Sequence, residues 1–213
     1  VERMGVAANP AMTHILAGIE TAINNGAAAV NVSIGSVLPE SLDGTEENYL
    51  LLRRGFLESL TAAVHAARRG DTLITFSAGN DGDGYDGNHQ PGMDNYIEAT
   101  TVYNDDQLLP DDSDTPTAAW DTNALIVAAT VAGAAFNEVL TPAQKMANFS
   151  RRGDVVNIAA PGESVGVGDG VSLDGTSFSA PLVAGAAGLV NSTNPDLIAP
   201  EVRQILLDSA NSE

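Results

Sequence analysis

The sequence contains no cysteine, a single lysine and no long apolar run, and these absences narrow its possible functions. Without cysteine the chain has no disulfide framework, no thiol nucleophile and no zinc site built on thiolates. No stretch of about 18 apolar residues is present, so no membrane-spanning helix is predicted. The first residues lack both an initiator methionine and the charged and apolar regions of a signal peptide, so we expect a processed or trimmed piece of a longer protein.

Basic residues are also scarce. The chain has 9 Lys and Arg against 28 Asp and Glu, a formal net charge of −19. Such a charge repels polyanions, so we expect neither nucleic acid nor an anionic membrane as a partner. An acidic chain without cysteine is compatible with a secreted or extracellular protein, which is the location we expect.

The hydrophobic pattern predicts an α/β fold. Ile15, Ile19 and Ile23 recur every four residues, which indicates a helix with one apolar face, and Gly26 is placed to end it. Further helices are expected over residues 47–69, after residue 177 and from about residue 200, and strands over residues 30–34, 73–76, 125–129 and 155–160. This alternation favours three layers, with a mostly parallel sheet between helices on both faces.

The segment between residues 81 and 117 is rich in Gly, Asp, Asn and Pro, and we expect it to be mostly loop. Its acidic and amide side chains include Asp81, Asp83, Asp86, Asn88 and Asp94. Hard oxygen ligands suit Ca²⁺, so Asp81, Asp83 and Asp86 are candidate ligands of a structural calcium ion. The spacing is not that of an EF-hand, and a solvated acidic loop is the alternative.

The candidate nucleophile is Ser177, in the segment DGTSFSAP at residues 174–181, which the small residues LVAGAAG follow. A serine at the start of a helix has its oxygen near the positive end of the helix dipole. The small residues would let that helix pass through a crowded core. Taken alone, the Gly-Thr-Ser sequence favours an ordinary helix cap followed by a core helix.

Two further segments follow predicted strands. In SAGNDG at residues 77–82, Asn80 could aim its amide N–H at developing negative charge, or it could be a turn residue. The segment VNVSIGS at residues 30–36 could bind a peptide backbone by strand addition, or it could be a core strand that runs into a turn.

In this chain order, these three segments resemble those of subtilisin-like serine proteases, the subtilases. Weaker matches are FSRRG at residues 149–153 and VNIAAPG at residues 156–162, and the resemblance runs from about residue 4 to residue 207. It implies peptide-bond hydrolysis through an acyl-enzyme on Ser177, with Asn80 and the Ser177 N–H holding the oxyanion. It also implies two sides of a cleft for a peptide or protein substrate, formed by Ser33, Ile34 and Gly35 and by Ser77, Ala78 and Gly79.

The chain departs from the family pattern in its histidines. The family's His-Gly-Thr-His motif has a glycine directly after the histidine. None of His14, His65 and His89 is followed by glycine, and no early Asp-Ser/Thr-Gly is present. We therefore expect residues 1–213 to be a partial peptidase domain that begins after the His motif and lacks the N-terminal strands. Because serine without its base is a poor nucleophile, this chain alone should be nearly inactive and should need an N-terminal fragment of the same protease as partner.

Two rival interpretations remain open at this point. The first is a non-catalytic member of the same family, retained as a peptide-binding or interaction module. The second is an unrelated α/β ligand-binding domain, although GVGDG at residues 166–170 fits neither a dinucleotide-binding nor a Walker pattern and is better explained as a turn. An α/β-hydrolase is disfavoured because position 179 is serine, which breaks the Gly-x-Ser-x-Gly pattern.

Overall fold

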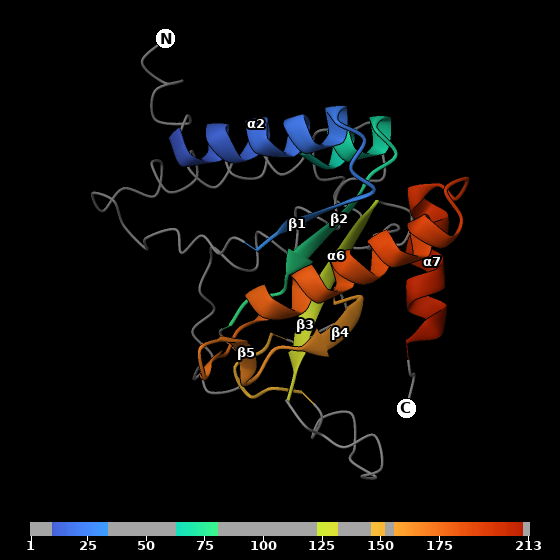
Figure 1. Cartoon of the computed structure of the whole chain (residues 1–213). Helices are drawn as coiled ribbons and strands as arrows, with labels where there is room; N and C mark the ends of the chain where they lie inside the picture. The colour runs from blue at the N-terminus through green and yellow to red at the C-terminus, as the bar shows by residue number, and fades with distance from the viewer. Residues whose placement is uncertain (1–9, 34–62, 81–122, 132–145, 152–155, 211–213) are drawn as a thin grey trace, which may run out of the picture.

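A four-stranded parallel sheet forms the centre of the computed structural model, which describes residues 10–33, 63–80, 123–131, 146–151 and 156–210 (Figure 1). In order across the sheet, the strands are β1 (Ala29–Val32), β2 (Leu73–Ser77), β3 (Ala124–Thr130) and β4 (Ile158–Pro161). All three pairings are parallel. The predicted parallel α/β fold is therefore confirmed.

Helices cover both faces of this sheet. On one face, Ile74 and Phe76 of β2 pack with α2 (Pro10–Asn24) and with a helix at residues 63–69. On the other face, Leu73 of β2 packs with α6 (Thr176–Thr193) and α7 (Ala199–Ser209). Successive strand residues point to opposite faces, so β2, which is buried along its whole length, separates the two cores.

Several element boundaries differ from the predicted ones. Gly26 follows the end of α2 as predicted, with a φ of 77° that favours glycine. The fourth strand begins at residue 158 rather than 155. Part of the segment expected to be only a turn forms β5 (Val165–Gly168), which pairs antiparallel with β6 (Val171–Leu173). The predicted helix start at residues 47–62 and the whole loop at 81–117 lie outside the described residues. No described helix combines the length and apolarity that a bilayer crossing requires.

The C-terminal end of the helix at residues 63–69 lies so close to α2 that Gly70 has no room for a side chain. A Cβ at Gly70 would overlap the Cγ2 methyl of Ile23, which is itself buried. The absence of a side chain at Gly70 therefore sets how closely the two helices approach.

We predict that Gly70→Ala destabilises the protein by about 1–3 kcal/mol, because the added methyl group overpacks the space against Ile23. Gly18→Ala is the matched control, since a Cβ at this helical position meets nothing within 4 Å. Urea denaturation of both variants checks the prediction. Equal midpoints for the two variants would contradict it.

Candidate active site

Ser177 lies in the first turn of α6, directly after Gly175 and Thr176. Thr176 is buried and Ser177 is half-buried. The free N–H groups of the first turn give this end of a helix a partial positive charge. Thr176 N–H donates to Asn80 and Phe178 N–H donates to the Gly175 carbonyl, whereas Ser177 N–H has no acceptor among the described residues. The first turn therefore offers an unused backbone donor beside the candidate nucleophile.

Asn80 binds this first turn with its amide oxygen. The Oδ1 atom accepts hydrogen bonds from Thr176 N–H and from the Thr176 hydroxyl, both at 2.9 Å. A backbone N–H can only donate, so the atom that faces it must be the oxygen, and the orientation of the amide follows. The Nδ2 group therefore stays available as a donor, and it lies 3.4 Å from the point that a Cβ on Gly175 would occupy.

Thr176 also fixes the segment that precedes Asn80. Its Oγ1 accepts a hydrogen bond from Gly79 N–H at 3.1 Å, and the Gly79 carbonyl accepts one from Arg151 N–H at 3.1 Å. Gly79 has a φ of 111°, which a residue with a side chain rarely adopts. The predicted Ser77, Ala78 and Gly79 are all buried at the end of β2, and Thr176 is the contact that joins them to α6.

The stretch around Gly162 supports Gly175 from the other side. The Gly162 carbonyl accepts a hydrogen bond from Gly175 N–H at 2.7 Å, and Gly162 N–H donates to the Thr130 carbonyl at the end of β3 at 3.1 Å. A Cβ at Gly162 would overlap Ser179 Oγ and would approach the Ala129 Cβ atom within 2.6 Å. The start of α6 is thus held by residues that follow β2 and by Gly162, which follows β4 and is itself bound to the end of β3.

Ser33 reaches the same turn from the end of β1. Its hydroxyl donates to the Ser177 carbonyl oxygen at 3.2 Å, so this predicted substrate-binding residue contacts α6 with its side chain. Ile34 and Gly35, which were predicted beside it, lie outside the described residues. The structure therefore brings together Ser33, Asn80 and Ser177 from three separate segments of the sequence.

Other candidates are not part of this cluster. His14 and His65 belong to α2 and to the helix at residues 63–69, which cover the face of the sheet opposite α6. His89 and the acidic residues Asp81, Asp83 and Asp86 lie outside the described residues. Within the ranges that the structure describes, no three His, Asp or Glu side chains are grouped to hold a metal ion. The calcium site stays a prediction.

Sequence reasoning missed the role of Thr176. It treated this residue only as part of the Gly-Thr-Ser motif, although Thr176 makes three of the hydrogen bonds that assemble the cluster. This role could have been predicted from the two short motifs that contain Asn80 and Thr176. If Gly79-Asn80 and Thr176-Ser177 belong to one site, the threonine hydroxyl is the natural partner for an amide that must be oriented.

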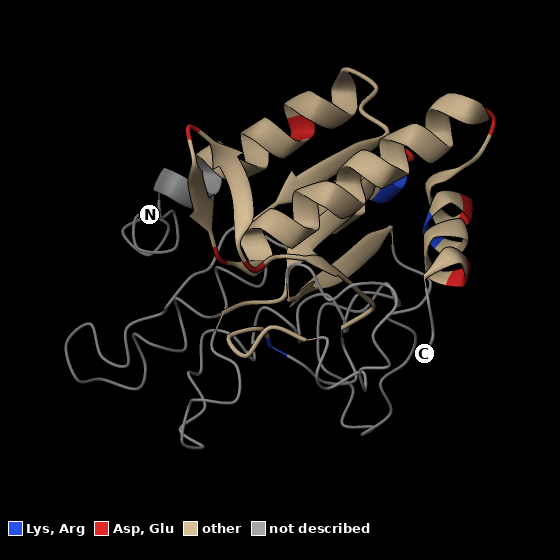
Figure 2. Cartoon of the chain, turned by 60° about the horizontal axis from the view of Figure 1, so that its bottom comes forward, with Lys and Arg blue, Asp and Glu red and all other residues tan. Residues whose placement is uncertain are grey.

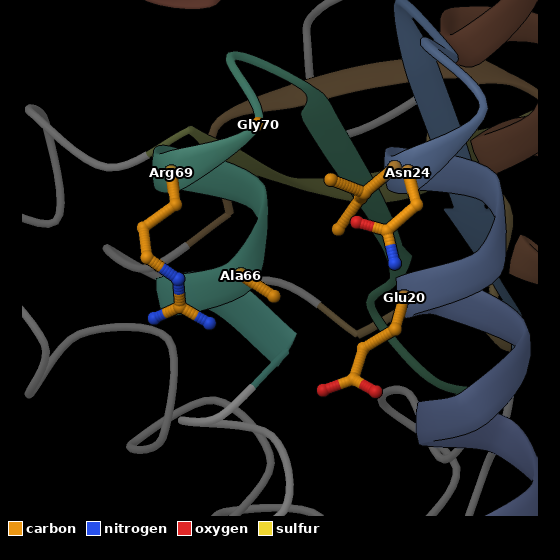
Figure 3. A pocket seen from close by; sticks show the side chains of 6 residues that line it. Glu20, Asn24, Ala66, Arg69 and Gly70 are labelled. Atoms are coloured by element: carbon orange, nitrogen blue, oxygen red, sulfur yellow. The ribbon is translucent and has the colours of Figure 1, made fainter.

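A pocket of about 320 Å³ lies near the start of β2, at the end of this strand opposite to Asn80 (Figure 3). It is formed between α2 and the helix at residues 63–69, and it is lined by Glu20, Ile23, Asn24, Ala66, Arg69 and Gly70. Arg69 and Gly70 come just before β2, whereas Asn80 comes just after it. The pocket is therefore separate from the Ser177 cluster, and none of the predicted site residues lines it.

The sequence is similar to several proteases. It is 27% identical over 216 residues to Subtilisin Savinase from Lederbergia lenta, a match that covers 100% of this chain and 60% of that protein. Over 75 residues it is 39% identical to the halolysin-like extracellular serine protease Nep from Natrialba magadii, covering 33% of this chain and 14% of Nep. The chain thus spans about 60% of Subtilisin Savinase, and a smaller share of Nep.

Solved structures show the same fold. The chain matches a structure of the subtilase cytotoxin SubAB with a TM-score of 0.59 and 23% identity, covering 93% of this chain and 57% of that one. It matches a cold-adapted subtilisin-like serine proteinase with a TM-score of 0.56 and 18% identity, covering 95% and 57%. The model of the subtilase family, Peptidase S8, matches residues 3–213, and with the assembled Ser177 cluster this match shows that the chain belongs to the subtilase family.

Proposed function

We propose that the protein is a serine endopeptidase that hydrolyses peptide bonds through an acyl-enzyme on Ser177. The observation that carries the proposal is the pair of hydrogen bonds from Thr176 to Asn80 Oδ1, which leaves the Nδ2 donor beside the first turn of α6. A donor fixed in advance where negative charge develops is the arrangement that stabilises an oxyanion. A helix cap would also accept through its side-chain oxygen, so the feature that favours an oxyanion donor is the Nδ2 group, which lies near Gly175.

In the proposed reaction, Ser177 Oγ attacks the carbonyl carbon of the scissile peptide bond and its proton passes to a histidine base. The carbonyl oxygen becomes an oxyanion and accepts hydrogen bonds from Asn80 Nδ2 and Ser177 N–H. The intermediate then collapses to an acyl-enzyme, and the departing amine takes the proton from the histidine. Water, activated by the same base, attacks the acyl carbon and releases the second product, which regenerates the Ser177 hydroxyl.

We propose that the histidine and its aspartate come from a segment of the same protease that precedes residue 1. Two observations support this source. The chain spans about 60% of Subtilisin Savinase, and the described His14 and His65 lie on the helices of the opposite face. Residues 1–213 alone would then carry the oxyanion donors but no base.

The surface of α6 fits a covering segment of this kind. The helix carries no Asp, Glu, Lys or Arg along its length (Figure 2). Such an uncharged helix is expected to be covered, yet the side chains of Leu182 and Leu189 are 48% and 70% exposed. Among the described strands, β1 pairs only with β2, so its other edge is open to a further strand. An N-terminal segment that adds a strand to β1 and packs on α6 would cover both features.

The proposed substrate is an extended peptide or an unfolded protein segment, bound beside residues 33–35 and 77–79. We further propose an extracellular location, in line with the relative Nep, whose name describes it as extracellular. An acidic surface with a net charge of −19 resists precipitation through self-repulsion and suits a protein that works outside the cell.

A fluorophosphonate probe tests the proposed nucleophile. We predict that the full-length protein is labelled, that Ser177→Ala abolishes labelling, and that residues 1–213 alone stay unlabelled because the base is missing. Ser192→Ala is the matched control, since Ser192 lies in the same helix and, among the residues that the structure describes, its hydroxyl donates only to the Leu189 carbonyl. A folded full-length protein that does not react would overturn the proposal and favour the non-catalytic peptide-binding alternative.

Two variants of Asn80 separate an oxyanion donor from a structural residue. We expect Asn80→Ala to lower kcat by roughly 100- to 1000-fold, the effect of losing one such donor in subtilisin. Asn80→Asp keeps the oxygen that accepts from Thr176 but replaces the Nδ2 donor, so we expect a loss at least as large. Steady-state kinetics on a peptide substrate measure both. Nearly normal kcat in Asn80→Asp would mean that Asn80 acts only by holding Thr176.

Calcium binding by the acidic loop around Asp81, Asp83 and Asp86 is a separate proposal. An ion that binds only the folded protein raises its melting temperature. We therefore predict a higher melting temperature of the full-length protein in millimolar Ca²⁺ than in EDTA, with Mg²⁺ as the control ion. An unchanged melting temperature would contradict the proposal.

A further inference from the structure

Pro181 removes one hydrogen bond from the first turn of α6. It lies inside the helix, four residues after Ser177. In an α-helix the N–H of each residue donates to the carbonyl four residues earlier, and proline has no N–H. The Ser177 carbonyl therefore loses its normal partner within the helix, and the proline ring also pushes against this carbonyl. In the first turn of α6, the carbonyl that lacks its donor four residues later thus belongs to Ser177, the proposed nucleophile.

The Ser33 hydroxyl takes the place of the missing donor. Its Oγ lies 3.2 Å from the Ser177 carbonyl oxygen, in a part-buried position between the end of β1 and α6. A carbonyl left without a partner away from water costs more than an ordinary hydrogen bond is worth, so replacement of the donor matters. Ser33 and Ser177 are 144 residues apart, and no local helix signal links them.

A neighbouring asparagine contacts the Ser33 hydroxyl with both atoms of its amide group. Asn31 Nδ2 donates to Ser33 Oγ at 3.0 Å, and the single hydroxyl hydrogen of Ser33 has two acceptors at 3.2 Å, the Ser177 carbonyl oxygen and Asn31 Oδ1. Asn31 Oδ1 in turn lies 3.2 Å from Thr75 Oγ1, and the two residues are Cα partners in the register of β1 and β2.

Thr75 extends these contacts along α6. It is fully buried, and its Oγ1 also lies 3.1 Å from the Ala180 carbonyl of α6. Asn31, Ser33 and Thr75 thus present polar groups to the first turns of α6. The same face of the sheet is otherwise apolar where it packs on α6 and α7.

We propose that Ser33 is a positioning residue for the nucleophile: its hydroxyl replaces the hydrogen bond that Pro181 cannot make and fixes the first turn of α6 against β1. The inference rests on the proposed protease function. Ser33 then has a second role. It belongs to the segment at residues 33–35 that is proposed to bind substrate, and its hydroxyl also bonds to Ser177, the residue proposed to attack the substrate. The distance between bound peptide and Ser177 then depends on this bond.

A double-mutant cycle between Ser33→Ala and Pro181→Ala in the full-length protein tests the proposal. In the Pro181 background, we expect Ser33→Ala to lower kcat roughly tenfold with little change in KM, the scale of one lost hydrogen bond at a reacting residue. In the Pro181→Ala background the new N–H of residue 181 can donate to the Ser177 carbonyl. There, Ser33→Ala should change kcat by no more than about twofold.

Thr75→Val is the matched control within the same group of residues. It removes a hydroxyl near α6, but the Ala180 carbonyl that this hydroxyl contacts can still accept the normal helix bond from residue 184. We expect a smaller loss of kcat than for Ser33→Ala, and the same loss whether position 181 holds proline or alanine. An equal effect of Ser33→Ala in the two backgrounds, or no effect in either, would overturn the proposal.

Hydrogen exchange of the amides at residues 176–180 gives a readout that does not need activity. Ser33→Ala should speed this exchange in the Pro181 background and change it much less in the Pro181→Ala background. Unreactive wild-type protein would refute the protease function, and the exchange cycle would still decide whether Ser33 fixes the turn. Unchanged exchange in Ser33→Ala would refute the positioning role even if the wild type is active.

Discussion

The Ser177 cluster depends on one side chain, the buried Thr176, which joins the start of α6 to the end of β2. Its N–H and hydroxyl both donate to Asn80 Oδ1, and its oxygen accepts from Gly79 N–H. Asn80 and Thr176 are 96 residues apart. These three bonds therefore decide where the amide of Asn80 lies relative to Ser177. They use only the Oδ1 atom of Asn80, so its Nδ2 group stays available, and Ser177 N–H has no acceptor among the described residues either.

The parallel sheet explains why residues so distant in sequence meet at one place. Ser33 follows β1, Asn80 follows β2 and Gly162 follows β4, and parallel strands end at the same edge of a sheet. The turn that starts α6 lies against this edge, where the Ser33 hydroxyl, Asn80 and the Gly162 carbonyl each bind it. The sheet sets the positions of the backbone ends, and polar side chains set the final orientation of the helix turn.

Sequence patterns were sufficient for the α/β class, for the central strands and for the segments that carry Ser33, Asn80 and Ser177. Each depends on local information: apolar runs, helix periodicity, or a short motif. The hydrogen bonds of Thr176 and the contact of Ser33 with the Ser177 carbonyl could not be predicted, because they join residues that only the folded chain brings together. Pro181 was a visible local signal of a missing helix bond, but sequence alone does not say which side chain replaces it. Strand β5 was missed because its glycines and its short length weaken any strand pattern.

The most direct test of this account is a crystal structure of the full-length protein after reaction with a phosphonate. The account predicts a bond from phosphorus to Ser177 Oγ, with a phosphonyl oxygen within about 3 Å of both Asn80 Nδ2 and Ser177 N–H. It also predicts that Thr176 still donates to Asn80 Oδ1 and that Ser33 Oγ still contacts the Ser177 carbonyl. A phosphonyl oxygen directed away from Asn80, or a probe attached to a different residue, would contradict it.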